Sequence, residues 1–313
     1  MPNFRPFRGD DTQAFLSLWN AALPLDGLTQ EIFERKVLLD ANLEPESLLL
    51  AFEGDRPVGF ILRLRLLQPI EMVGLLEERG FITAMGVHPD HRRRGIGQAL
   101  LDDTFEFFRK RNRKEIVIAP YTPNYFVPGI DKENYAEGVR LFRNNGFAEY
   151  SEGIAMDASI PLFRLAPEVI EKERALAAEG IIFRPLGRED ILPYLQFLKE
   201  CMPGPWVEDA RRNLLDATKG IFDYDACLLA LDGGKIIGYC AFEREHYGPY
   251  GVSDKYQGKG IGTVLMARTL DLMRQKGYHS AWVLWTGERA AKGVYGRLGF
   301  KITRRFAIMK KTL

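Results

Sequence analysis

The chain has 313 residues, about twice the length of an ordinary domain, and 46% of them are hydrophobic, which is enough to fill two cores. The 43 Lys and Arg residues nearly balance the 42 Asp and Glu residues, so the charge gives no reason to expect a nucleic acid or an anionic membrane as partner. The three cysteines are widely spaced without a CxxC pair or a His cluster, and no apolar run suits a signal peptide or a membrane span. We therefore expect a two-domain cytoplasmic protein with reduced thiols and no metal site.

The chain begins with a short strand that leads into an acidic helix start over residues 4–11, and the same pattern recurs over residues 183–190. In both places Asp or Glu occupies the first helical turn, where the helix dipole favours negative charge. A β-hairpin with a glycine turn is predicted over residues 52–60 and again over residues 231–239, at the same offset of 179 residues. The sequence therefore predicts two copies of one fold.

A glycine-rich turn follows the hairpin in each copy, between a strand and an amphipathic helix. The two turns read Arg92-Arg93-Arg94-Gly95-Ile96-Gly97 and Gln257-Gly258-Lys259-Gly260-Ile261-Gly262. Backbone N–H groups at a helix start point outward, and glycine lets phosphate oxygens approach them, so each turn predicts a pyrophosphate site. A Walker loop is excluded because Lys259 is followed by Gly, and neither copy has the spacing of a Rossmann fingerprint.

The offset between the copies falls along the chain, which places insertions in the first copy near residues 68–80 and 121–134. These loops suit either site-lining segments or plain surface elaboration. Residues 166–180 combine apolar, Glu and Lys residues with a final glycine and predict a helix that connects the copies. The expected domains are therefore residues 1–165 and 181–313.

The two turns resemble the Gln/Arg-x-x-Gly-x-Gly/Ala motif of the GNAT (Gcn5-related N-acetyltransferase) family, and the order of predicted elements matches that family over nearly the whole chain. The resemblance implies an α/β fold of two tandem domains, each a mixed, mostly antiparallel central sheet flanked by helices. It also implies acetyl-CoA as cosubstrate, with an acetyl group passed to a primary amine of a small molecule or peptide. Coenzyme contacts are then expected from Val87, Arg92, Arg93, Arg94, Gly95, Ile96 and Gly97 in the first copy, and from Val252, Gln257, Gly258, Lys259, Gly260, Ile261 and Gly262 in the second.

In GNAT enzymes a tyrosine four residues before a Gly-Phe pair commonly protonates the departing thiolate, which suits a phenol that is protonated at neutral pH. The second copy has Tyr295 at this position, whereas the first copy has Phe142. The resemblance therefore implies a catalytic second copy and a coenzyme-binding first copy that is not catalytic, as two-copy GNAT proteins such as mycothiol synthase have one working half. Tyr121, Tyr125 or Tyr135 of the inserted loop is an alternative acid for the first copy.

The general base is expected among Glu243 and Glu245, which strand alternation places on one face, with His246 beside them. Trp206, Trp285 and Tyr247 suit either an apolar acceptor or packing. One departure from the family is Glu288, which stands where many members have Asn, seven residues before the tyrosine. The alternatives left open are a non-catalytic acyl-CoA-binding or scaffold protein, and an amino-acyl or fatty-acyl donor in place of acetyl.

Overall fold

The structure is a computed structural model that describes residues 2–122, 124–202 and 204–313. Its contacts divide the chain into two compact units. Unit 1 contains the residues up to Pro69 together with Gly74–Gly153 and Arg305–Leu313, and unit 2 contains Ile70–Val73 and Ile154–Arg304. Within the described residues, no helix carries an apolar stretch long enough to cross a bilayer.

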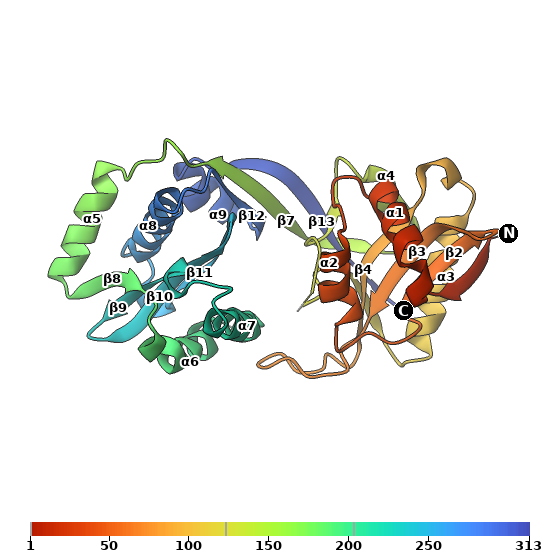
Figure 1. Ribbon diagram of the computed structural model, residues 1–313, viewed down its shortest axis with the longest axis horizontal. Helices are drawn as coiled ribbons and strands as arrows, with labels where there is room; N and C mark the ends of the chain where they lie inside the picture. Colours follow the sequence, from red (N-terminus) through yellow and green to blue (C-terminus); the bar gives the residue numbers. More distant parts are fainter. Residues whose placement is uncertain (1, 123, 203) are drawn as a thin grey trace. The chain divides into compact units, whose positions relative to one another are not determined.

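Unit 1 is built on a mixed sheet in the strand order β1-β2-β3-β4-β5-β13, with β6 paired to β13 (Figure 1). The pair β4–β5 is parallel, and the other pairs are antiparallel. Its strands are β1 (Asn3–Pro6), β2 (Leu48–Glu53), β3 (Arg56–Leu64), β4 (Arg79–Val87), β5 (Glu115–Ile118), β6 (Ile130–Asp131) and the second part of β13 (Lys301–Thr312). Its helices are α1 (Thr12–Ala22), α2 (Gln30–Phe33), α3 (Ile96–Arg109) and α4 (Ala136–Asn144).

Helices cover both faces of this sheet, and neighbouring residues of β3 show why. Phe60 stacks on Trp19 of α1 with the ring centroids 5.0 Å apart. Gly59 faces α3 instead, and a Cβ atom at this position would lie 2.9 Å from the Ile96 side chain. Because successive strand residues point to opposite faces, α1 and α3 lie on opposite sides of the sheet. Glycine at position 59 allows α3 its close approach.

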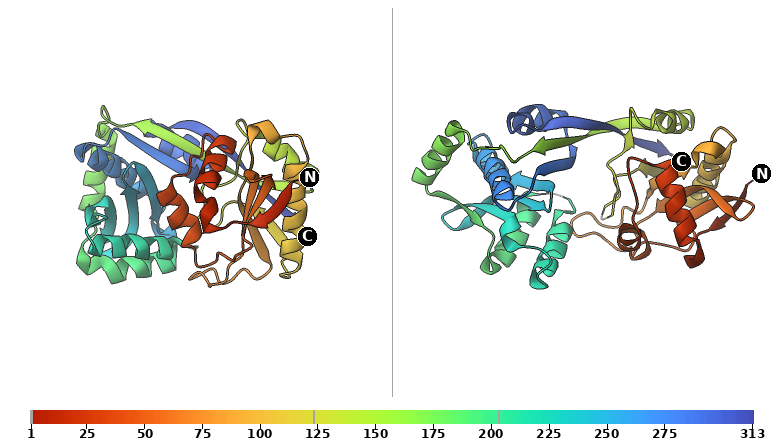
Figure 2. Two further views of the ribbon diagram at one scale, coloured as in Figure 1. Left: turned by 45° about the vertical axis from the view of Figure 1, so that its right-hand side comes forward. Right: turned by 45° about the horizontal axis from the view of Figure 1, so that its top comes forward.

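Unit 2 repeats this plan in the strand order β7-β12-β11-β10-β9-β8, with β11–β12 as the parallel pair. In Figure 1 the strands β9–β11 lie between α8 above and α6 and α7 below, and Figure 2 shows the same layers from two further sides. The strands are β7 (Ala148–Ser159), β8 (Ile181–Pro185), β9 (Cys227–Asp232), β10 (Lys235–Glu243), β11 (His246–Val252) and β12 (Ser280–Thr286). The helices are α5 (Pro167–Ala178), α6 (Ile191–Cys201), α7 (Trp206–Thr218), α8 (Ile261–Gln275) and α9 (Glu288–Ala290).

The last strand of each copy completes the sheet of the other unit. Strand β7 leaves unit 1 after Gly153, and its residues from Ile154 onward pair with β12 of unit 2. Strand β13 leaves unit 2 after Arg304 and pairs with β5 of unit 1 from Met309 onward. The compact units therefore exchange their final strands, and the ranges 1–165 and 181–313 stay a prediction for the two copies of the repeat.

Other features expected from the sequence are present. Both hairpins form, as β2–β3 and β9–β10, and the connecting helix forms as α5. The insertions of the first copy are the long connections between β3 and β4 and between β5 and α4. Pro123 of the second connection lies outside the described residues. All three cysteines are unpaired.

Candidate coenzyme site

A cavity of about 850 Å³ lies in unit 1, where β4 and β5 separate. The parallel pairing of these strands ends at Ile82 and Ile118, whereas β4 continues to Val87. Thr83 forms a β-bulge at the point of separation, because the register between β3 and β4 shifts there. The cavity is bounded by the end of α1, by β4, by the starts of α3 and α4, and by residues 126–135 of the inserted loop. Its volume is that of a small-molecule site.

The glycine-rich turn at the start of α3 opens onto this cavity. Gly95 precedes the first helical residue with a φ of 80°, in the left-handed region that favours glycine. A Cβ atom at Gly95 would meet no atom within 4 Å, so the space in front of the turn is open. Arg93 also adopts a left-handed φ of 62°, where the second copy has Gly258 at 79°. Non-glycine residues in this region are strained and occur preferentially at functional turns.

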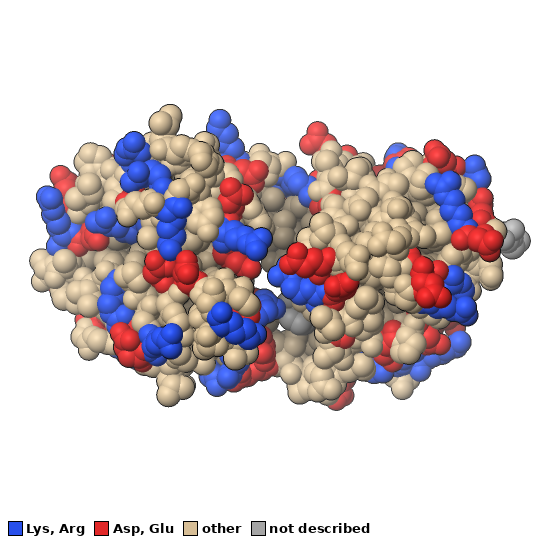
Figure 3. Space-filling view, viewed as in Figure 1, with Lys and Arg blue, Asp and Glu red and all other residues tan. Residues whose placement is uncertain are grey.

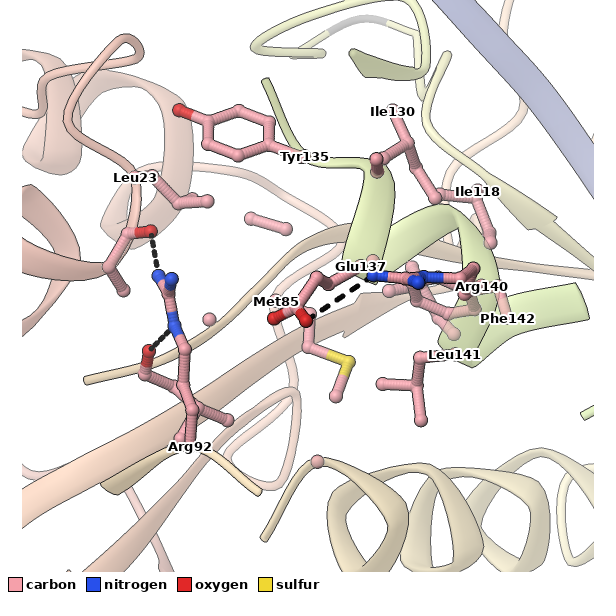
Figure 4. A pocket seen from close by; sticks show the side chains of 18 of the residues that line it. Leu23, Met85, Arg92, Ile118, Ile130, Tyr135, Glu137, Arg140, Leu141 and Phe142 are labelled. Carbon is pink, nitrogen blue, oxygen red and sulfur yellow. Dashed lines mark hydrogen bonds and ion pairs between the residues drawn. The ribbon is translucent and has the colours of Figure 1, made fainter. Parts of the chain in front are cut away.

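The three consecutive arginines of this turn have different surroundings, and Figure 4 shows the first of them, Arg92, with its two hydrogen bonds. Arg92 donates from Nε to the carbonyl oxygen of Val87 at 3.2 Å and from Nη2 to that of Ala22 at 3.1 Å, which ties the turn to β4 and α1. Arg94 donates to the Asp90 carbonyl oxygen at 2.9 Å. Arg93 is largely exposed, and its guanidinium lies 3.7 Å from the carboxylate of Glu137. The sequence grouped these side chains as anion ligands, but Arg92 is engaged in holding the backbone.

The wall opposite the turn is mostly apolar. Figure 4 shows Met85 of β4, Ile118 of β5, Ile130 of the inserted loop and Leu141 of α4 around the cavity. A Cβ atom on Gly97 would lie 3.2 Å from Leu141 and 3.4 Å from Met85, so these side chains reach the first turn of α3. Phe142 also lines the cavity and belongs to the hydrophobic core of unit 1. An apolar, partly enclosed wall of this kind excludes water from a bound ligand.

The tyrosines of the inserted loop have unequal access to the cavity. Tyr135, which precedes α4, lines it, and its hydroxyl oxygen accepts a hydrogen bond from the Leu25 amide at 3.2 Å. Tyr121 is fully buried and donates to Asp40, so it is not exposed to a ligand. Of these two alternative acids, only Tyr135 lines the cavity.

Aromatic rings fill the corresponding place in unit 2. Tyr250 pairs with Cys240 on the neighbouring strand as Met85 pairs with Ile61 in unit 1, so it takes the place of Met85. Its ring centroid lies 5.9 Å from that of Tyr295, and the Tyr295 ring lies 5.3 Å from that of Phe300. Tyr295 is only 4% exposed, and burial raises its pKa.

The ring contacts confirm that Tyr295 and Phe142 are equivalent positions. Tyr295 meets Phe300 edge-on at 79°, and Phe142 meets Phe147 edge-on at 83° with 5.2 Å between centroids. Both therefore serve as packing partners of the Gly-Phe phenylalanine.

Helix α5 covers the glycine-rich turn of unit 2. Gly260 has a φ of 88°, like Gly95, but a Cβ atom there would lie 2.7 Å from Cε of Lys172. A hydrogen bond of 2.8 Å from Arg268 of α8 to Glu173 holds α5 in place. Lys172 of α5 therefore lies in front of Gly260, whereas a Cβ atom at Gly258 of the same turn would meet no atom within 4 Å.

The other expected contacts of this turn lie around it. Gln257 donates to Asp254 at 2.6 Å, Lys259 lies over the ring of Tyr256, and Ile261 is buried in the core. A Cβ atom on Gly262 would lie 3.5 Å from Val252, an ordinary packing distance. The structure therefore brings all these residues together, but around a turn that α5 covers.

The expected pair of general bases does not share a strand. Strand β10 ends at Glu243 and β11 begins at His246, with Arg244 at a φ of 53° in the tight turn between them. Strand alternation consequently does not apply to Glu243 and Glu245, and their position on one face stays a prediction. His246 instead lies against the ring of Trp282, with 4.4 Å between centroids.

Sequence reasoning missed much of the cavity wall. The end of α1 contributes Trp19 and Ala22, and the inserted loop contributes Phe126, Val127 and Ile130. The only signal for the loop was its length relative to the second copy, and the α1 residues show an ordinary helical pattern.

Comparisons with known proteins agree with this architecture. The model of the acetyltransferase (GNAT) family matches residues 12–126 and 192–300, one match in each copy. No curated protein sequence is significantly similar to the chain.

Solved structures share the fold at low sequence identity. A GCN5-related glucosamine N-acetyltransferase region of a fungal multi-domain GH3 β-N-acetylglucosaminidase is 17% identical over 99% of this chain, with a TM-score of 0.81, and the match spans 38% of that chain. A GCN5-related N-acetyltransferase from Sphaerobacter thermophilus is 18% identical with a TM-score of 0.73, over 99% of this chain and 95% of that one. A tandem GNAT protein from the clavulanic acid biosynthesis pathway is 16% identical with a TM-score of 0.64, over 100% of this chain and 98% of that one. The family matches in both copies and the repeated fold lead to one conclusion: this chain belongs to the acetyltransferase (GNAT) family and carries two tandem copies of its fold.

Proposed function

We propose that the protein is an acetyl-CoA-dependent N-acetyltransferase that binds its coenzyme in the cavity of unit 1. The observation that carries this proposal is the cavity between β4 and β5, which opens directly onto the glycine-rich start of α3. The equivalent turn of unit 2 is covered by Lys172, and the neighbouring space is filled by tyrosine rings. The proposal therefore expects one coenzyme site per chain, in the first copy.

The residues of unit 1 suit the parts of acetyl-CoA in order. The backbone N–H groups of Gly95, Ile96 and Gly97 would bind the pyrophosphate, because the first-turn amides of a helix lack intrahelical partners and carry the positive end of the dipole. Arg93 and Arg94 would add positive charge at the rim. The β4 backbone near Met85 and Val87 would hydrogen-bond the pantetheine arm, since β4 continues there beyond its pairing with β5.

The reaction requires a neutral amine, a polarised thioester carbonyl and an acid for the thiolate. The amine nitrogen attacks the thioester carbon, the carbon–sulfur bond breaks, and the thiolate takes a proton from an acid. The proton that the nitrogen loses goes to solvent or returns to that acid. We assign the role of this acid to Tyr135, because its side chain lines the cavity and the Leu25 amide donates to its oxygen, which stabilises the phenolate that would form. Tyr295 with Glu243 and Glu245 remains the competing assignment, in unit 2.

The acceptor is proposed to be a small-molecule or peptide amine. Asp26 and Glu133 line the cavity and favour a ligand with a cationic end, whereas Glu137 is paired with Arg93 and Arg140. Positive and negative side chains are mixed over the face shown in Figure 3, which therefore offers no extended basic surface to a polyanion.

The test is a calorimetric titration with acetyl-CoA, followed by turnover assays on a panel of primary amines. One site per chain is expected. Tyr135→Phe should lose roughly 10² to 10⁴ in kcat with little change in coenzyme affinity, whereas Tyr295→Phe should keep its rate. The opposite pattern would move the chemistry to unit 2. Binding without turnover on any amine would favour an acyl-CoA-binding protein, and the absence of binding would refute the proposal.

A further inference from the structure

A buried polar cluster lies at the start of the inserted loop of unit 1, apart from the residues that line the cavity. It consists of Asp40, Asn42, Tyr121 and Asn124. Asp40 is 6% exposed, Asn42 is 4% exposed and Tyr121 is 0% exposed. Burying a carboxylate costs free energy unless hydrogen bonds compensate the lost hydration. The Asp40 carboxylate therefore needs hydrogen-bond donors from its neighbours.

The Asp40 carboxylate is the centre of this cluster. The Tyr121 hydroxyl donates to it, 3.0 Å from each oxygen, and Asn124 donates from Nδ2 at 2.7 Å. The backbone N–H of Asn42 donates to the same carboxylate at 2.8 Å. Burial and the Asp40 charge raise the pKa of Tyr121, so its hydroxyl stays protonated and remains a donor at every working pH.

Asn42 extends the cluster to a third segment of the chain. Its Nδ2 donates to the Tyr121 hydroxyl at 2.8 Å, and its Oδ1 accepts from the amides of Leu67 and Gln68 at 2.7 and 3.0 Å. The cluster therefore joins the segment after α2, the end of β3 and the start of the inserted loop. Unit 2 has no counterpart, because Gly287 alone separates β12 from α9.

The loop that this cluster holds is a wall of the cavity. Further along, Lys36 donates to the Tyr125 carbonyl oxygen at 2.8 Å, and the Phe126 ring packs on Trp19 with 4.9 Å between centroids. Phe126 lines the cavity, as do Ile130 and Tyr135 beyond it. The position of these side chains thus depends on where the loop leaves β5, which the Asp40 cluster fixes.

We propose that Asp40 and Tyr121 are positioning residues of the acetyltransferase site: they anchor residues 124–135 as the wall of the coenzyme cavity. This inference rests on the proposed function of unit 1. Neither residue touches the ligand, and the anchor acts at the apolar wall rather than at the glycine-rich turn. It therefore affects the binding of the pantetheine arm and the acyl group, and leaves the phosphate-binding part of the site unchanged.

The test uses the full chain with Tyr121→Phe and Asp40→Asn. Tyr121→Phe keeps the buried ring but removes the acceptor of Asn42 Nδ2 and one of the donors to Asp40, which keeps its hydrogen bonds from Asn124 and from the Asn42 backbone N–H. Asp11→Asn is the matched control, because it removes another hydrogen-bonded carboxylate of unit 1, paired with Arg5 near β1. Each variant is titrated with acetyl-CoA and with adenosine 3′,5′-bisphosphate, which lacks the arm, and amide hydrogen exchange is followed over the inserted loop.

Tyr121→Phe is expected to bind acetyl-CoA roughly tenfold more weakly, about 1.4 kcal/mol, and to bind the bisphosphate with unchanged affinity. Exchange within residues 124–135 should rise. Asp40→Asn should weaken acetyl-CoA binding and raise loop exchange at least as much as Tyr121→Phe does. Asp11→Asn should change the affinity for neither ligand. Unchanged loop exchange in Tyr121→Phe, or a parallel loss of both ligands, would overturn the anchoring role. If the wild type binds neither ligand, the proposed function fails, and exchange alone then decides whether the anchor exists.

Discussion

Replacing Gly95 by Asp places a carboxylate where the proposal places a pyrophosphate. The substitution is feasible because a Cβ atom at Gly95 meets no atom within 4 Å. Asp and Asn tolerate the left-handed φ of 80° better than most residues, and a carboxylate at the start of α3 is favoured by the helix dipole. Gly95→Asn has nearly the same shape and backbone strain without the charge, so comparing the two variants isolates electrostatic repulsion.

The expected size of the repulsion follows from Coulomb's law. Two unit charges about 4 Å apart interact by about 1 kcal/mol in bulk water and by about 4 kcal/mol near a protein surface. Gly95 stands at the rim of the cavity, so the expected repulsion lies between these two energies. Gly95→Asp should therefore bind acetyl-CoA at least about tenfold more weakly than Gly95→Asn.

The assay is isothermal titration of both variants, with Gly260→Asp and Gly260→Asn as the matched pair in unit 2. The Gly260 pair should bind acetyl-CoA like the wild type, because Lys172 already occupies the space in front of Gly260. The difference within the Gly95 pair should shrink at high salt. Equal affinities of Gly95→Asp and Gly95→Asn would refute phosphate binding at this turn, and a loss confined to the Gly260 pair would place the coenzyme in unit 2.

Three further predictions concern the cavity, the thiols and an ion pair. Met85→Tyr should lower acetyl-CoA affinity about tenfold or more by filling the cavity as Tyr250 fills unit 2, whereas Tyr250→Met should leave it unchanged in the same titration. Cys201 should react first with a thiol reagent in the native protein, because burial raises the pKa of the other two thiols; faster labelling of either buried thiol would contradict this. Hydrogen bonds of 2.5 and 2.8 Å from Arg184 lower the pKa of Asp190, so their stabilisation is present above the unfolded pKa and is lost as pH falls through the folded one. Wild type should accordingly exceed Asp190→Asn by about 1–2 kcal/mol in free energy of unfolding at pH 7. The difference should vanish in acid, once the pH falls below the lowered pKa of folded Asp190.

Features set by short-range chemistry could be read directly from the sequence. The repeated hairpins, the glycine-rich turns and the connecting helix depend on residues close together in the chain, through turn sterics and apolar periodicity. The same holds for the left-handed backbone at Gly95, since the conformation of a residue before a helix is a local requirement. The fold class and the family followed from these elements and their order.

Which copy is open depends on contacts between distant segments. Met85 and Tyr250 occupy equivalent strand positions, but only Tyr250 meets a second tyrosine, Tyr295, which comes from beyond β12. Lys172 lies on a helix whose pattern does not reveal that it covers Gly260. An inserted loop likewise shows its length in the sequence but not which wall it forms.

The exchange of final strands was decided by tertiary structure alone. The strands that contain Met156 and Met309 follow the same Gly-Phe pair and occupy equivalent places in the repeat, so their patterns favour neither sheet over the other. A sheet edge accepts any strand with a matching apolar face, and the strand's own sequence does not specify the partner. The sequence by itself therefore determined two copies and their glycine-rich turns, whereas long-range packing determined which unit is open and which strand completes each sheet.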